Sequence, residues 1–168
     1  PQELLHLDVL RSHVTVEARL EDGSVVTERV RAIGLGDEDQ LRYRRWVQRC
    51  EDTVERLSGG EVGYVHVAGM SEDSFRVLYR DALGRHSDAG ALLVDTRWNG
   101  GGWLHDDLVG FLGAKDYLWF VPRGKEPGNL GAEPARRWSR PVAVLMNEGN
   151  YSDAHVFPYA FRALGLGK

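Results

Sequence analysis

The sequence has one cysteine, no excess of basic residues and no long apolar run. A disulfide within the chain is excluded because Cys50 stands alone, and a lone thiol suits a reducing compartment. The 25 acidic residues outnumber the 21 basic ones, which gives a net charge of −4. We therefore expect no nucleic-acid partner. No apolar run approaches the roughly 20 residues of a membrane span, and the first residues lack the features of a signal peptide, so we expect no membrane association.

Common motifs for metals and phosphates are missing too. Neither HExxH nor a paired CxxC pattern occurs, so we expect no metal site. The P-loop and the GxGxxG fingerprint are also absent, and we expect no cofactor.

What the chain does contain, from about residue 61 onward, is an alternation of strand-like and helix-like segments. This order predicts an α/β fold with a mostly parallel sheet and crossover helices. The expected strands are 61–67, 91–95, 117–121 and 142–146, and the expected helices are 72–83, 104–112 and 155–164. The segment 122–140, rich in Pro, Gly and Arg, is expected to be a long loop.

The first 60 residues predict different elements. Two alternating runs, 14–18 and 25–30, flank a turn at 21–24 and predict a β-hairpin. After a loop at 35–39, apolar residues at helical spacing predict a helix over 40–57. Its apolar stripe comprises Tyr43, Trp46, Val47, Cys50, Val54 and Leu57.

Two loops that follow buried strands carry the candidate chemistry. The first, 95–102, ends in Gly100, Gly101 and Gly102, whose backbone N–H groups can approach a ligand closely. Asp95 and Arg97 are expected to pair and brace this loop. The second loop, 147–153, places Ser152 between a strand and a helix, beside the unpaired N–H groups of the helix start. We interpret Ser152 as a peptidase nucleophile; the alternative is a simple helix N-cap.

A serine nucleophile needs a general base. His66 and His105 are at positions that could line the same crevice, whereas His155 is expected on the surface or in packing. The other three histidines are expected in loops or on the surface: His6, His13 and His86.

Several runs resemble the C-terminal protease domain of the tricorn protease family. They are 41–47, 57–67, 94–102 (Val-Asp-Thr-Arg-Trp-Asn-Gly-Gly-Gly), 147–157 (Asn-Glu-Gly-Asn-Tyr-Ser-Asp-Ala-His-Val-Phe) and 161–168. The resemblance implies a crotonase-like α/β fold of the ClpP/crotonase type and a cytoplasmic serine peptidase. It also implies peptide substrates and a ring-shaped homo-oligomer. The hairpin at 1–36 resembles the end of that family's PDZ domain, and 37–168 resembles part of its peptidase core.

The resemblance also assigns roles. Ser152 is the implied nucleophile, and the backbone N–H groups of Asp153 and Gly101 are the implied oxyanion hole, with Gly100 and Gly102 binding substrate. The resemblance implies that the family's catalytic histidine and glutamate fall outside these 168 residues. We therefore expect the 168 residues alone to have negligible peptidase activity.

Two other functions stay open at this stage. The first is a crotonase-like enzyme acting on CoA thioesters, with a basic patch formed by Arg123, Lys125, Arg136 and Arg137. The second is a non-catalytic peptide-binding or structural module, in which Ser152 only caps a helix.

Overall fold

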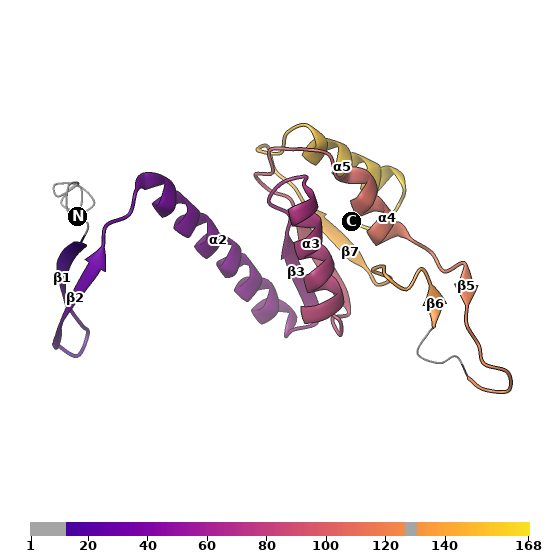
Figure 1. Ribbon diagram of the computed structural model, residues 1–168, viewed down its shortest axis with the longest axis horizontal. Helices are drawn as coiled ribbons and strands as arrows, with labels where there is room; N and C mark the ends of the chain where they lie inside the picture. The colour runs from indigo at the N-terminus through magenta and orange to yellow at the C-terminus, as the bar shows by residue number, and fades with distance from the viewer. Residues whose placement is uncertain (1–12, 127–130) are drawn as a thin grey trace. The chain divides into compact units, whose positions relative to one another are not determined.

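The computed structural model describes residues 13–126 and 131–168 (Figure 1). The chain divides into two compact units, the first ending at Trp46 and the second beginning at Val47.

The first unit contains an antiparallel hairpin. Strands β1 (His13–Arg19) and β2 (Val25–Arg31) pair so that Val16 lies opposite Glu28. The turn closes with a hydrogen bond from the Leu20 N–H to the Ser24 carbonyl, 2.8 Å. Gly23 has a φ of 83° in this turn, a conformation that glycine adopts without steric cost.

Helix α2 (Leu35–Ser58) is longer than the sequence predicts. The loop expected at 35–39 was wrong, because these residues form the first turn of the helix. Asp37 and Glu38 stand in that turn, where the helix dipole favours negative charge. Gly59 ends the helix with a φ of 63°. No helix in the described ranges is both long and apolar enough to cross a bilayer.

The second unit is built on a three-stranded parallel sheet in the order β3-β4-β7. The strands are β3 (Val62–His66), β4 (Ala91–Asp95) and β7 (Val142–Leu145). Val94 of β4 lies opposite Val65 on one side and Val144 on the other. The parallel sheet predicted from the apolar runs is confirmed, and all three carboxyl ends lie at one edge.

Three helices connect these strands and follow the last one. They are α3 (Glu72–Arg80), which continues into the π-helical turn η1 (Asp81–Arg85), α4 (His105–Gly113) and α5 (Asp153–Ala163). In Figure 1, α3 lies alongside β3, and α4 lies beside α5. Leu78 and Ala82 are buried, with Phe75 and Tyr79 packed against the same core. The Ser71 side chain caps α3 by accepting the Ser74 N–H at 3.4 Å.

The strand expected at 117–121 does not belong to the parallel sheet, so that prediction was wrong. Only β5 (Leu118–Trp119) forms there, and it pairs antiparallel with β6 (Ala132–Glu133). Residues 117–121 are all exposed. An apolar run thus predicted a strand without showing whether it would face the core or solvent.

The segment 122–140 is not wholly a loop either. Besides β6 it contributes Trp138 to the core, with the indole N–H donating to the Pro141 carbonyl at 3.3 Å. The Arg140 guanidinium lies 4.1 Å from the centre of that ring. Residues 127–130 fall outside the described residues.

Replacing Leu78 tests the core of the second unit. Leu78 is fully buried, so Leu78→Ala removes its packing and leaves a cavity. We expect the free energy of unfolding in urea to fall by about 2–5 kcal/mol. Leu57→Ala is the matched control because Leu57 is 73% exposed, and it should change the free energy by about 0.5 kcal/mol or less. Equal losses in the two variants would contradict the assignment of Leu78 to the core.

Candidate functional site

Two loops meet at the carboxyl edge of the parallel sheet. The glycine loop (residues 96–104) follows β4, and the serine loop (residues 146–152) follows β7. A Cβ atom added to Gly101 would lie 2.7 Å from the Ser152 Cβ and 3.4 Å from the Asp153 nitrogen. The structure therefore brings Gly101 together with Ser152 and Asp153, which lie 51 and 52 residues later in the sequence.

Two of the three glycines are required by close contacts. Gly101 has a φ of 96°, and a side chain there would collide with Ser152 and with the Tyr151 carbonyl. Gly102 has a φ of 141°, and a Cβ there would overlap the carbonyl oxygen of Met70. Gly100 is exposed and would tolerate a Cβ. Only glycine allows the loop to approach both neighbours.

The backbone of Ser152 is strained. Its φ of 53° and ψ of −124° lie outside the regions that residues with side chains prefer, at a cost of about 1–3 kcal/mol. Its side chain is exposed and makes no capping hydrogen bond to α5. Ser71, by contrast, caps α3 from an ordinary extended conformation, with φ −135° and ψ 160°. Helix capping therefore does not explain Ser152.

The backbone donors beside Ser152 differ in their partners. Asp153 is the first residue of α5, and no backbone carbonyl of the described residues accepts its N–H. The Gly101 N–H donates to Asn99 Oδ1 at 2.8 Å. An anion at this site would thus meet the Asp153 N–H, which no described backbone carbonyl accepts, and the Gly101 N–H, which already donates to the Asn99 side chain.

Asn99 joins three segments of the second unit. Its side chain is fully buried; Nδ2 donates to the Val67 carbonyl at 2.8 Å, and Oδ1 accepts the Gly101 N–H. Its own carbonyl accepts the Tyr151 N–H at 3.0 Å. Sequence reasoning missed this residue. The available signal was an asparagine just before the glycines, since a side-chain amide both donates and accepts.

Asn150 and Thr96 form a second buried link between the loops. Asn150 Nδ2 donates to Thr96 Oγ1 at 2.9 Å and to the Ala154 carbonyl at 3.1 Å. Thr96 Oγ1 donates in turn to the Leu145 carbonyl at 2.9 Å. These bonds fix the end of β7 and the start of α5 against the glycine loop.

The Asp153 carboxylate ties the starts of α4 and α5 together. It is buried, and Oδ2 accepts the N–H groups of Leu104 at 2.6 Å and His105 at 3.1 Å. Oδ1 lies 2.5 Å from His105 Nδ1. A carboxylate at a helix start is favoured by the helix dipole, so Asp153 stabilises the first turn of α4.

The predicted pairing of Asp95 with Arg97 is confirmed. Arg97 Nε lies 2.9 Å from Asp95 Oδ1, and Tyr64 donates its hydroxyl hydrogen to Oδ2 at 2.7 Å. Burial opposes ionisation of Asp95, but these bonds hold the pKa of its carboxyl below the ordinary value. Burial and the nearby carboxylate raise the pKa of Tyr64. Arg97 also donates to Cys50 Sγ at 3.4 Å, which connects the loop to α2.

The histidines occupy different environments. His66 ends β3 with Nδ1 2.9 Å from the Asp95 carbonyl, and its burial lowers its pKa. His155 is exposed, as predicted. His86 was expected in a loop or on the surface. It lies in the turn after η1 and is half-buried: its ring fills the space beside Gly63, and Nε2 lies 3.1 Å from the Tyr64 carbonyl. His6 lies outside the described residues.

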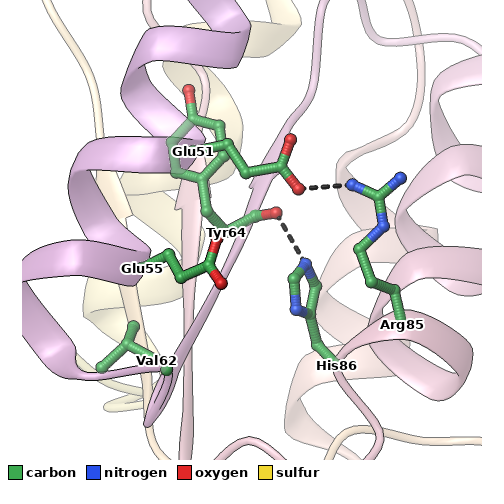
Figure 2. A pocket seen from close by; sticks show the side chains of 7 residues that line it. Glu51, Glu55, Val62, Tyr64, Arg85 and His86 are labelled. Carbon is green, nitrogen blue, oxygen red and sulfur yellow. Dashed lines mark hydrogen bonds and ion pairs between the residues drawn. The ribbon is translucent and has the colours of Figure 1, made fainter.

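A cavity of about 220 Å³ lies elsewhere, against the first half of β3. Figure 2 shows Glu51 paired with Arg85 and His86 directed at the Tyr64 carbonyl. None of the residues that line this cavity belongs to the glycine loop or the serine loop, so it is separate from the site of Ser152. Within the described ranges, no group of three or more His, Cys, Asp or Glu side chains could hold a metal ion.

The structure predicts that Asn99 is needed to hold the two loops together. Asn99→Ala leaves the buried Val67 carbonyl and the half-buried Gly101 N–H without the Asn99 side chain as a partner. An unpaired buried group costs about 1–3 kcal/mol. We expect a loss of this size or larger in urea unfolding. Gln48→Ala is the control because the Gln48 amide makes only exposed side-chain bonds on α2, and it should have little effect. An Asn99→Ala variant as stable as Gln48→Ala would contradict the prediction.

The lowered pKa of His66 predicts that mild acid destabilises the fold. Burial lowers its folded-state pKa below the ordinary value of 6.5, so the unfolded chain binds a proton more readily. The stability that His66 contributes is present above about pH 6.5 and is lost as the pH falls through its folded-state pKa. We expect the urea midpoint to decrease from pH 7.5 to pH 5.5, and less steeply in His66→Gln. The same slope in both proteins would exclude His66 as the cause.

The chain is similar to known proteins of one family. Residues 61–168 match the model of peptidase family S41. The tricorn protease of Thermoplasma volcanium is 33% identical over 154 residues, covering 92% of this chain. Tricorn protease homolog 1 of Streptomyces coelicolor is 34% identical over 135 residues, covering 80% of the chain.

The fold is also similar to that of a solved tricorn protease. A crystal structure of the tricorn protease superposes with a TM-score of 0.70 and 27% identity, covering 94% of this chain and 15% of the solved one. The chain spans only 14% and 12% of the lengths of the two relatives named above. On the match over residues 61–168, and with this similarity to tricorn proteases, the chain belongs to peptidase family S41.

Proposed function

We propose that this chain carries the nucleophile of a serine peptidase, and that Ser152 is that nucleophile. The observation that carries the proposal is the strained backbone of Ser152, with a φ of 53° and an exposed hydroxyl that caps nothing. Strain of this kind clusters at functional sites, and a sharp strand-to-helix turn is a known way to present a serine nucleophile.

In the proposed reaction the Ser152 hydroxyl oxygen attacks the carbonyl carbon of a peptide bond and loses its proton to a general base. The resulting oxyanion is bound by the N–H groups of Asp153 and Gly101. The tetrahedral intermediate expels the amine, which takes up the proton and leaves an acyl-Ser152 ester that water then hydrolyses. The Gly101 N–H reaches the oxyanion only if it leaves Asn99 Oδ1 or shares its hydrogen between the two acceptors. Gly100 and Gly102 are proposed to line the substrate path.

The general base and the residue that orients it are proposed to lie outside these 168 residues, as the resemblance to tricorn proteases implies. The same resemblance supports peptide substrates, a ring-shaped homo-oligomer, a cytoplasmic location, a crotonase-like core and a PDZ-like origin for the hairpin. The alternative CoA-thioester activity is not carried forward, because Arg137 of its basic patch is paired with Asp116.

A fluorophosphonate probe tests the nucleophile directly, because it reacts covalently with an activated serine. In the full-length protein that contains this chain, we expect labelling of wild type and none in Ser152→Ala. Mass spectrometry of the labelled peptide should place the adduct on Ser152.

Ser71→Ala is the matched control. Ser71 also precedes a helix but caps it, so its loss should cost about 1 kcal/mol of stability and leave labelling intact. The proposal would be wrong if the folded wild-type protein were not labelled. It would also be wrong if the Ser152→Ala variant still reacted with the probe.

A further inference from the structure

Trp98 shares an unusual property with Ser152. Among the described residues, these two are the non-glycine residues with positive φ, 64° at Trp98 and 53° at Ser152. The proposed function accounts for the strain at Ser152. It does not account for a large aromatic residue held where glycine would fit without strain.

The indole of Trp98 is held against the serine loop. Its backbone N–H donates to Asn147 Oδ1 at 3.0 Å. Gly149 leaves the space for the ring, since a Cβ on Gly149 would overlap the Trp98 ring carbons. The ring is thus positioned by the same loop that ends in Ser152.

Packing in the core does not explain this arrangement, because Trp98 is 59% exposed. Two more exposed aromatic side chains belong to the glycine loop and the serine loop. Tyr151 precedes Ser152 in the chain, and Trp103 stacks edge-on against His105, which contacts Asp153. Exposed apolar side chains grouped around a candidate site are typical of a binding surface.

We propose that Trp98 is a specificity-determining residue, whose indole forms one wall of the subsite for a large apolar or aromatic side chain beside the scissile bond. This inference rests on the proposed function of Ser152. The exposed face of the ring offers apolar area that such a side chain would remove from water, and the exposed Tyr151 side chain precedes Ser152 directly. A small substrate side chain would leave the indole exposed to water and would gain little binding free energy from apolar burial.

The test uses the full-length protein and two series of fluorogenic peptides. In one series the residue before the scissile bond is varied, and in the other the residue after it. The varied residue is Phe, Leu, Ala, Lys or Asp. We expect wild type to prefer Phe and Leu. Trp98→Gly should lower kcat/KM for these two peptides by about 10-fold or more and change the Ala peptide by about 2-fold or less. Glycine suits the backbone at this position, so the variant should fold.

Trp98→Phe should recover most of the preference, because it restores an aromatic wall. Trp119→Ala is the matched control: Trp119 is also exposed, at 55%, but lies on β5, and its loss should leave the preference unchanged. Fluorophosphonate labelling is measured on every variant and should not change, because the probe needs the nucleophile and not the subsite.

The two proposals fail in different ways. Normal labelling with equal kcat/KM losses for all peptides in Trp98→Gly, or with no losses, overturns the role of Trp98 and leaves Ser152 in place. A wild-type preference for Lys or Asp over Phe and Leu does the same. Absence of labelling in wild type overturns the nucleophile, and the subsite with it.

Discussion

The site depends on a small set of buried hydrogen bonds between the glycine loop and the serine loop. Asn99 bonds to Val67, just after β3, and to Gly101 and Tyr151. Asn150 ties Thr96 to the start of α5. Buried polar groups are costly unless they are paired, so these bonds permit few alternative positions for either loop. They hold Gly101 in contact with Ser152.

The same network supports strain that an isolated loop would relieve. Ser152 and Trp98 hold positive φ angles because their neighbours are fixed on both sides: Ser152 by Tyr151 and the Asp153 carboxylate, and Trp98 by Asn147 and Gly149. In each case the side chain remains exposed while the backbone around it is anchored. Rigid support beneath exposed groups is what a binding or catalytic site needs, because the reacting geometry is then set before the ligand arrives.

Much of the second unit could be predicted from periodicity and composition. The strands of the parallel sheet and the helices between them were expected within a few residues, because buried parallel strands are continuous apolar runs and amphipathic helices repeat every 3.6 residues. The errors came where local pattern is ambiguous. The run 117–121 is apolar yet exposed, the residues 35–39 start a helix, and Trp138 enters the core from a segment that reads as loop. These outcomes depend on contacts with residues distant in sequence.

By itself the sequence determined that two loops with candidate chemistry follow buried parallel strands, and therefore that both lie at one edge of a sheet. It also determined the family, because the motifs at 94–102 and 147–157 are specific in combination. Only the tertiary structure decided which atoms meet there: that the Ser152 side chain caps no helix, that Asn99 occupies the Gly101 N–H, and that Trp98 lies against Gly149. The reason is physical. Side-chain periodicity reports which face is buried, whereas the positions of loop atoms are set by hydrogen bonds between segments about 50 residues apart.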